Sequence, residues 1–513
     1  MLEPQTVSLL DVMASHGRWR GDWPAVVTPE ETLSWSMFER RTSRLANRLV
    51  LEGAQRGDRV ALLMSNGLPM LELIFGIMKA GCIVVPINPS SAQASIAAML
   101  DDAGARFVFA TADHMAKVGQ VTGVTYVAAT NASHAVDAHW GDYGSWLGAV
   151  QEQAPEIAIA PTDLCNIIYS SGTTGEPKGI AHTHEARLFW AQDLALALRY
   201  HSGARALVVT GLYSNISWGV MLCTFLAGGT LFLRESFDAA DAIATISRER
   251  ITHTGMVPVQ FQRLLQHPAF GCADHTSMQS MMSVGSPLPE ATKLQLFETF
   301  TCGVTDVYGS TEGIITTHAI EEVAGRIRSV GRPLPGSDIR ILGDEDRPVP
   351  IGETGEVVGR SRFVMAGYWR KPAATANVMW ADEQGRYWLR SGDIGRLDER
   401  GYLYIVDRKK DMILSGAQNI YPADIEAVLI QHPDVLECAV IGVPSATWGE
   451  SPLALVVPMP EAAVDAEGIL RWLNENVGKR QRVVTVEIRS ELPRNAAGKL
   501  LKRDLRAPYW AAV

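Results

Sequence analysis

The sequence lacks several features that mark specialised classes of protein. Its 513 residues contain no low-complexity tract and no run of basic residues, and 46 Lys plus Arg against 56 Asp plus Glu give a net charge of −10. A chain that is acidic overall and has no basic tract is a poor candidate for binding nucleic acid or an anionic membrane surface. We therefore expect its partners to be small molecules, and any cations that bind them to be local.

Paired cysteines and a secretory signal are also missing. The six cysteines show no C-x-x-C spacing, which argues against a disulfide framework or a structural zinc site and suits a reducing cytosol. Glu3 and Asp11 precede the first Lys or Arg, so the N-terminus does not follow the pattern of a secretory signal. These absences favour a cytoplasmic location. The cysteines are Cys82, Cys165, Cys223, Cys272, Cys302 and Cys438.

One long stretch has no charge, yet it does not predict a membrane span. Residues 206–233 contain no charged residue and no His, but Ser, Asn and Thr occur in the first half and the pair Gly228-Gly229 interrupts the second. A buried helix that runs into a buried strand fits this pattern better than a span of about 20 apolar residues. We therefore expect no membrane-spanning segment.

The first half of the chain alternates between two kinds of apolar pattern. Apolar residues recur at helical spacing in 36–53 and 68–81, whereas 58–65 and 82–89 are short apolar runs typical of buried strands. Alternation of strands and helices predicts an α/β fold with mostly parallel sheets covered by helices. A chain of this length can form more than one domain.

The composition of the sequence changes near Val330. Residues 330–406 are rich in Gly and Pro and contain short β-like runs, which predicts a small β subdomain. Residues 407–513 follow with a strand, a charged turn, a helix and a strand, typical of a separate α+β domain. We expect a large N-terminal domain over 1–406 and a smaller C-terminal domain over 407–513, with the run "DRKKD" at 407–411 as the linker.

A loop dense in Gly, Ser and Thr follows the apolar run "NIIY". The stretch from Tyr169 to Gly179 reads "YSSGTTGEPKG", and such a loop can hold phosphate because its backbone N–H groups, hydroxyls and Lys all donate to anions. It does not fit G-x-x-x-x-G-K-[ST], since Lys178 follows Pro177 and precedes Gly179. The alternative is a flexible surface turn. The candidate phosphate-binding residues are Ser171, Gly172, Thr173, Thr174, Gly175 and Lys178.

This stretch resembles the signature of the adenylate-forming superfamily, which comprises acyl- and aryl-CoA synthetases, peptide-synthetase adenylation domains and luciferases. Further similar motifs follow in order over essentially the whole chain, and they are closest to AMP-forming acyl- or aryl-CoA synthetases. These motifs are "DVYGSTEG" (306–313), "RSGDIGRLDERGYLYIVDRKKDMI" (390–413), "SGAQNIYPADIE" (415–426), "GVPSATWGE" (442–450) and "LPRNAAGKLLKRDLR" (492–506).

The resemblance implies an ATP-dependent ligase that works in two half-reactions. A carboxylate attacks the α-phosphorus of ATP to give acyl-AMP and pyrophosphate, and the thiol of CoA then displaces AMP. A second possibility is transfer of the acyl group to a carrier protein or an amine. A third is a catalytically silent relative that only binds AMP or an acyl group. Because the residues given roles below are present, the third possibility is disfavoured.

Roles for four residues of the "DVYGSTEG" motif are implied by the same resemblance. Tyr308 is expected to lie against the adenine, and Asp306 to accept a hydrogen bond from its amino group. Thr311 is expected to bond to the α-phosphate, and Glu312 to hold Mg²⁺, whose charge neutralises phosphate oxygens.

Roles in the C-terminal part are carried over in the same way. Asp393 is expected to accept both ribose hydroxyls, and Arg408 to contact the ribose and phosphate. Lys499 is expected to bridge the attacking carboxylate and the α-phosphate from a mobile domain, with a hinge at Lys410. Lys502, in the same basic run, is expected to be an ordinary surface lysine.

The acceptor site and the oligomeric state are less defined by sequence. The segment with Gly416 and Ala417 is expected to line the pantetheine tunnel, and Trp448 to help bind CoA, with a core position as the alternative for Trp448. No carrier-protein motif follows Lys499, which favours free CoA as the acceptor. A homodimer is left open.

The acid pocket is expected to accept a mid-sized hydrophobic monocarboxylic acid, aryl or aliphatic. No Arg or Lys lies in the segments expected to form its walls, which disfavours a dicarboxylate. His182 and His184 lack a third ligand nearby in sequence, so we interpret them as structural and not as a metal site. The candidate pocket residues are Tyr213, Ser214, Trp218, Val284 and Gly309.

Overall fold

The protein forms two compact units in a computed structural model. The first unit comprises Met1–Ile327, Pro333–Asp338 and Arg360–Leu389, and the second comprises Arg328–Arg332, Ile339–Gly359 and Arg390–Val513. The structure describes residues 7–119, 123–128, 139–170, 177–415, 418–445, 447–460, 465–479, 481–494 and 500–510.

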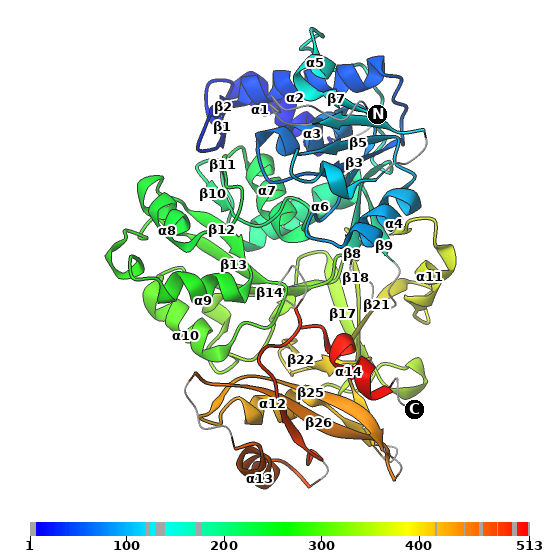
Figure 1. Cartoon of the computed structure of the whole chain (residues 1–513). Helices are drawn as coiled ribbons and strands as arrows, with labels where there is room; N and C mark the ends of the chain where they lie inside the picture. Colours follow the sequence, from blue (N-terminus) through cyan, green and yellow to red (C-terminus); the bar gives the residue numbers. More distant parts are fainter. Residues whose placement is uncertain are drawn as a thin grey trace. The chain divides into compact units, whose positions relative to one another are not determined.

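The first unit is built on two large sheets (Figure 1). One has the strand order β16-β15-β14-β13-β12-β10-β11-β1-β2, and its pairings from β14 to β1 are parallel. The other has the order β19-β9-β8-β4-β3-β5-β6-β7, parallel from β8 to β7. The strands of the nine-stranded sheet are β1 (Pro24–Val27), β2 (Thr32–Ser34), β10 (Arg205–Val208), β11 (Thr230–Leu233), β12 (His253–Met256), β13 (Ser280–Val284), β14 (Thr305–Gly309), β15 (Ile315–His318) and β16 (Arg332–Pro333). Those of the eight-stranded sheet are β3 (Arg59–Leu63), β4 (Ile83–Pro86), β5 (Phe107–Ala110), β6 (Thr125–Ala128), β7 (Trp140–Asp142), β8 (Leu164–Ser170), β9 (Lys178–Thr183) and β19 (Gly367–Tyr368).

Helices fill the space between the two sheets and cover their outer faces. The main core joins α1, α2, α3, α6 and α7 to strands of both sheets, so these helices form the middle layer. A second cluster packs α8, α9 and α10 on the other face of the nine-stranded sheet, and a third packs α4 on the eight-stranded sheet. The helices of this unit are α1 (Leu9–Trp19), α2 (Trp35–Leu51), α3 (Leu68–Lys79), α4 (Gln93–Ala103), α5 (Tyr143–Leu147), α6 (His184–Ala197), α7 (Asn215–Ala227), α8 (Ala239–Arg248), α9 (Pro258–Gln266), α10 (Glu290–Thr299) and α11 (Pro372–Asn377).

The α/β fold predicted from the sequence is confirmed. The apolar runs at 58–65 and 82–89 form β3 and β4, and the helical patterns at 36–53 and 68–81 form α2 and α3. The uncharged stretch 206–233 contains the buried helix α7 followed by the buried strand β11, because Gly228 ends the helix in a left-handed conformation. Among the helices of the described segments, none is both long and apolar enough to cross a bilayer.

The second unit contains the C-terminal α+β part of the chain. Its sheet has the order β24-β23-β26-β25, with β27 beside β26. The sequence predicts a helix directly after the charged turn, but the hairpin of β23 and β24 comes first, with Ser415 paired to Gln418. The elements are β23 (Ile413–Ser415), β24 (Gln418–Ile420), α12 (Pro422–Leu429), β25 (Val435–Ser445), β26 (Gly449–Pro458), α13 (Ala466–Asn476), β27 (Val486–Ile488) and α14 (Lys502–Trp510).

A five-stranded sheet forms most of the stretch expected to be a β subdomain. It has the order β17-β18-β21-β20, and β22 pairs with β21. The strands β17, β18 and β21 each run from one compact unit into the other along the chain. Their bounds are β17 (Ser337–Leu342), β18 (Gly355–Ser361), β20 (Met379–Ala381), β21 (Tyr387–Leu397) and β22 (Leu403–Arg408).

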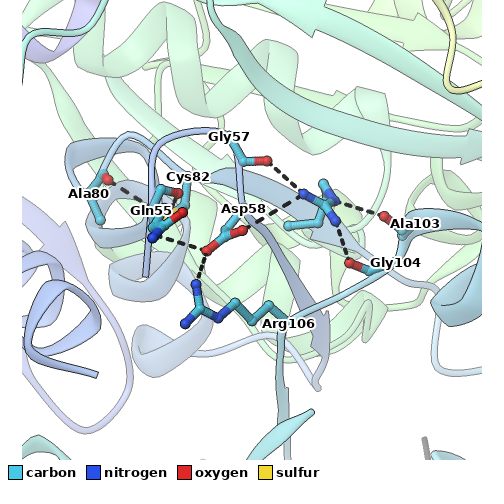
Figure 2. Close-up of polar contacts among 9 residues, drawn as sticks. Gln55, Gly57, Asp58, Ala80, Cys82, Ala103, Gly104 and Arg106 are labelled. Atoms are coloured by element: carbon cyan, nitrogen blue, oxygen red, sulfur yellow. Dashed lines mark hydrogen bonds and ion pairs between the residues drawn. The ribbon is translucent and has the colours of Figure 1, made fainter. Parts of the chain in front are cut away.

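A polar network fixes the start of β3 against its neighbours. Asp58 accepts from the Arg106 guanidinium at 2.7 Å and from the backbone N–H of Gln55 at 2.8 Å (Figure 2). Arg59 donates to the carbonyl oxygens of Ala103 and Gly104 at the end of α4. Ligands of open parallel sheets bind at the carboxyl ends of the strands, so this network serves the opposite, structural end.

Cys82 is buried and belongs to the same network. Its thiol donates to the carbonyl oxygens of Gln55 at 3.5 Å and Ala80 at 3.7 Å (Figure 2). Burial raises the pKa of the thiol to about 12. The neutral form therefore dominates at neutral pH, which argues against a nucleophilic role for Cys82.

Candidate active site

The hairpin between β14 and β15 carries the central residues of the site. Gly309 pairs with Ile315, and the Ser310 N–H donates to the Ile314 carbonyl at 2.9 Å, which closes a turn that contains Thr311 and Glu312. A Cβ atom at Gly309 would lie 2.5 Å from the Ile314 oxygen. Glycine is therefore needed at this position because the two chain segments approach so closely.

A buried histidine forms a hydrogen bond with the backbone of this turn. His182, in β9, has its Nε2 atom 2.9 Å from the carbonyl oxygen of Thr311, and its Nδ1 lies 3.5 Å from the side-chain nitrogen of Asn166. Burial lowers the pKa of His182 well below its usual value, with a further contribution from the Arg187 charge. The neutral imidazole therefore donates from Nε2 to Thr311 and positions the turn.

Glu312 is held by a tyrosine that sequence reasoning missed. The Tyr368 hydroxyl donates to Glu312 Oε1 at 2.9 Å, and the Lys178 ammonium lies 5.4 Å from the centre of the Tyr368 ring. The structure thus brings together Lys178, from the end of the candidate phosphate loop, and Glu312. No local motif marks Tyr368 in the sequence, and its place follows from the short strand β19, which pairs with β9 after Gly367 at a φ of +145°.

Several predicted residues lie outside the described residues. They are Ser171, Gly172, Thr173, Thr174 and Gly175 of the phosphate loop, Gly416 and Ala417 of the acceptor segment, and Lys499. The strands on either side of the phosphate loop are described, and Ser170 of β8 pairs with Lys178 of β9.

Asp306 and Tyr308 lie on β14, which leads into the turn. The Asp306 carboxylate is buried and pairs with the buried ammonium of Lys293 at 3.4 Å. Lys293 also lies 3.3 Å from His318 and donates to the Ile327 carbonyl at 3.2 Å. Tyr308 is partly exposed, directly before Gly309.

Four of the five expected acid-pocket residues lie near the start of α7 or at the end of β13, and Gly309 lies at the end of β14. Ser214 precedes α7, and its hydroxyl is buried with no hydrogen-bond partner among the described residues. Trp218 is fully buried, and its indole N–H donates to the Leu212 carbonyl at 2.9 Å. Tyr213 is partly buried before the helix, and Val284 is partly buried at the end of β13.

An arginine from outside those segments reaches the same region. Arg187, on α6, donates to the side-chain oxygen of Asn215 at 2.9 Å. The absence of Arg and Lys from the wall segments was the reason for disfavouring a dicarboxylate. Because α6 packs against α7, the Arg187 cation lies beside Asn215 although the wall segments themselves contain no Arg or Lys. The expectation about dicarboxylates remains a prediction.

The second unit places Asp393 and Arg408 opposite each other. They form a register pair of β21 and β22, and Arg408 Nε lies 3.3 Å from Asp393 Oδ1. Lys410 lies in the turn after β22. Trp448 is 58% exposed in the turn between β25 and β26, so it is not a core residue.

The expectation that Lys502 is an ordinary surface lysine is wrong. Its ammonium pairs with Glu426 at 2.7 Å, and its side chain is only 13% exposed. Burial opposes its charge, but the Glu426 and Asp407 carboxylates outweigh that effect and raise the pKa of Lys502.

The fold and the site define a class of protein, an enzyme of the adenylate-forming ligases. The family model described as "AMP-binding enzyme" matches residues 14–369, and the model described as "AMP-binding enzyme C-terminal domain" matches residues 424–499. The chain therefore belongs to the AMP-binding enzyme family, and its predicted membership of the adenylate-forming superfamily is confirmed.

Individual relatives fit this assignment over nearly their full lengths. A feruloyl-CoA synthase from Amycolatopsis sp is 34% identical over 503 residues, which cover 95% of this chain and 99% of the relative. The ATP-bound structure of MatB from Rhodopseudomonas palustris has a TM-score of 0.86 at 27% identity, covering 98% of this chain and 99% of that one. The amide bond synthetase McbA from Marinactinospora thermotolerans has a TM-score of 0.85 at 27% identity, with 97% and 100% covered.

Proposed function

We propose that the protein is an AMP-forming carboxylate–CoA ligase. A carboxylate oxygen of the acid attacks the α-phosphorus of ATP, and pyrophosphate leaves. The sulfur of CoA then attacks the acyl carbon, and AMP leaves with the bridging oxygen while the thiol proton is released. The observation that carries this proposal is the turn with Thr311 and Glu312, tied through Tyr368 to Lys178, in a chain of the AMP-binding enzyme family.

The first half-reaction needs two anions to be held together. We propose that the phosphate loop and Lys178 bind the β- and γ-phosphates, and that the Thr311 hydroxyl donates to the α-phosphate. Because the turn is held by His182 and Tyr368, its donors need little reorganisation when charge develops on the phosphate. Tyr308, Asp306, Asp393 and Arg408 are proposed to bind the adenosine part.

Glu312 fits a site for Mg²⁺. Its Oε1 atom accepts from Tyr368, which orients the carboxylate and leaves its second oxygen for a ligand. One carboxylate suffices, because Mg²⁺ in such sites keeps several waters and takes further oxygens from phosphates. The ion would neutralise charge on the triphosphate.

Lys499 is proposed to bridge the attacking carboxylate and the α-phosphate during adenylation only. We expect Lys499→Ala to abolish acid-dependent pyrophosphate release, while most of the thioester step survives when acyl-AMP is supplied. The two rates are measured separately, by pyrophosphate release and by acyl-CoA formation from synthetic acyl-AMP. An equal loss in both would contradict the role given to Lys499.

The acceptor is proposed to be free CoA, and the acid a mid-sized hydrophobic one. The exposed indole of Trp448 is available to a ligand, which supports its proposed part in CoA binding. Transfer to an amine or a carrier protein is the second candidate, and the likeness to an amide bond synthetase favours keeping it.

The test is a screen of acids for pyrophosphate release, followed by a choice of acceptors. With an active acid, AMP and thioester formation are compared for free CoA, a carrier protein and a simple amine. We expect thioester formation with free CoA. Product with the amine or carrier protein alone would establish the second candidate, and no pyrophosphate with any acid would refute adenylation altogether.

A further inference from the structure

Arg187 is a buried cation at the centre of the middle helical layer. It is 4% exposed, and its guanidinium lies 4.8 Å from the ring centre of Trp190 and 5.1 Å from that of Trp218. Its Nε donates to Asn166 Oδ1 at 2.8 Å, and its Nη1 donates to Asn215 Oδ1 at 2.9 Å. Two aromatic faces and two amides therefore fix the orientation of the guanidinium.

One nitrogen of this guanidinium makes no hydrogen bond to the described residues. Nη2 is buried and has no hydrogen-bond partner among the described residues, and no described carboxylate forms an ion pair with Arg187. A buried charge without a counter-charge is costly, and native structures normally pair it. Burial lowers the pKa of Arg187 to about 10, so the side chain still carries its proton at neutral pH.

The guanidinium lines a narrow cavity that reaches the catalytic turn. The cavity has a volume of about 10 Å³, room for one water molecule or one oxygen atom of a larger ligand. Ser310 and Thr311 of the turn line it together with Arg187 and Asn215. The Ser310 hydroxyl is also buried without a partner among the described residues, so two unused donors lie on the walls of one cavity.

Arg187 is also linked to Thr311 through side chains. Asn166 accepts from Arg187 and lies against His182, which bonds to the carbonyl oxygen of Thr311. A ligand that contacts Arg187 is therefore bound by a group whose position is fixed relative to the turn that carries Thr311.

We propose that Arg187 binds a second oxygen function of the acid substrate, so that this enzyme prefers acids with an oxygen acceptor besides the carboxylate that is activated. The inference rests on the proposed function and narrows its substrate class. A hydroxyl and a second carboxylate share this chemistry, and both can accept from Nη2. An acid with a wholly apolar body offers Nη2 no acceptor, and sites built around such a donor reject ligands that lack the acceptor.

The test compares acids of matched size. One set is hexanoate, ω-hydroxyhexanoate and adipate, and the other is cinnamate, para-hydroxycinnamate and para-carboxycinnamate. The value of kcat/KM for pyrophosphate release is measured for each with the full-length enzyme. We expect at least one oxygen-bearing acid to exceed its unsubstituted partner by at least about tenfold. The hydroxyl and carboxylate arms show which oxygen function is bound.

The variant Arg187→Met keeps the length of the side chain and removes the donor. It should bring the ratio within a set close to one, mainly by raising KM for the oxygen-bearing acid. Arg234→Met is the control, because Arg234 is buried but already pairs with Asp241 at 2.9 Å. It should leave the ratio unchanged, whatever it does to stability.

Three results would overturn the inference while leaving adenylation intact. The first is a wild-type enzyme that prefers the unsubstituted acid in both sets, which decides the matter even if Arg187→Met does not fold. The second is an equal loss on all acids in Arg187→Met, since that would assign Arg187 to the reacting carboxylate. The third is an Arg187→Met variant that keeps both the wild-type ratio and the wild-type rates. No pyrophosphate with any acid would instead refute the proposed function.

Discussion

Tyr368 contacts two candidate site residues that lie far from it in the sequence. Lys178 lies almost 200 positions before it, and Glu312 belongs to a separate motif. Its hydroxyl donates to Glu312 and its ring lies under the Lys178 ammonium. Tyr368→Phe removes the hydrogen bond and keeps the ring. Hydrogen bonds to charged groups contribute about 1.5–3 kcal/mol, so we expect pyrophosphate release to fall by about tenfold or more.

The thermal midpoint separates this effect from damage to the fold. Tyr387→Phe is the matched control, because Tyr387 is 67% exposed on β21. It should leave both activity and midpoint unchanged. Tyr368→Phe with wild-type pyrophosphate release would show that Glu312 does not depend on this tyrosine.

The sequence can identify a candidate site residue when the residues beside it form a recognisable motif. Thr311, Glu312 and Lys178 lie within dense local motifs, so the sequence alone identifies them as candidates, and their roles remain predictions. Tyr368 and Arg187 have no such motif, and their meaning comes only from contacts across the sheet or between helices. Lys502 was misjudged for the same reason, because Glu426 is distant in sequence.

At the scale of elements, α14 and the residues beside it connect the two described segments on either side of 495–499, which include Lys499. The Leu501 N–H donates to the Pro493 carbonyl at 2.8 Å, and Arg494 and Leu500 form a β-bridge. Lys502, the first residue of α14, ties this region to Glu426 on α12. The described residues on both sides of 495–499 are therefore fixed to one another.

Lys502→Met tests this connection. It leaves the largely buried Glu426 carboxylate, whose side chain is 21% exposed, without its cation, and breaking a buried pair typically costs about 3–5 kcal/mol. We expect the thermal transition of the second unit to fall by several degrees, and hydrogen exchange at α12 to rise. Lys479→Met, at an exposed position, is the control. An unchanged transition in Lys502→Met would mean that the pair is not stabilising.

The contact between α2 and α3 predicts a pH dependence of stability. Glu72 on α3 is 4% exposed, and burial raises its pKa to about 7 despite Arg41 Nε at 2.7 Å. Arg44 also lowers the pKa, and Glu31 raises it. Between pH 4.5 and 7 the folded chain holds a proton on Glu72 that the unfolded chain loses, so this group makes stability fall as pH rises through that window.

Glu72→Gln removes this titration. We expect the variant to be more stable than the wild type at pH values above the folded pKa, by up to about 3 kcal/mol, and equal to it in acid. Urea unfolding at several pH values measures the difference, and Glu30→Gln on the surface is the control. A wild type that remains the more stable form in alkaline buffer would show that the Arg41 pair outweighs burial.

Elements were predictable where apolar periodicity alone decides them. The helix α7 and the strand β11 follow from a patterned stretch closed by Gly228, and the parallel sheets follow from the alternation of such stretches. The hairpin of β23 and β24 was missed because its strands are three residues each and carry little pattern. Short strands gain their stability from neighbouring strands, here β26, which lies later in the chain.

At the scale of the whole molecule, the chain has two compact units and one proposed hinge. The second unit begins with segments well before position 407, and Lys410 lies within it, after β22. The boundary expected at 407 remains a prediction. The second unit is assembled from three separate segments of the chain, and the strands β17, β18 and β21 each have residues in both units. A single boundary placed along the sequence cannot describe such a unit.

The last prediction concerns the proposed hinge at Lys410. If the C-terminal part changes its orientation between the two half-reactions, the backbone at Lys410 has to change its φ angle. No described residue accepts a hydrogen bond from the Lys410 N–H, so Lys410→Pro removes no donor contact while it fixes φ near about −65°. Lys410→Ala keeps the freedom of the backbone and is the control.

We expect Lys410→Pro to slow one half-reaction by at least about tenfold and to leave the other within about twofold, because a locked φ suits one orientation and not both. Pyrophosphate release and acyl-CoA formation from supplied acyl-AMP are measured separately. Lys410→Ala should retain both. If both rates fell equally in the proline variant at an unchanged thermal midpoint, the turn would be needed in a single conformation and the hinge would have to lie elsewhere in the chain.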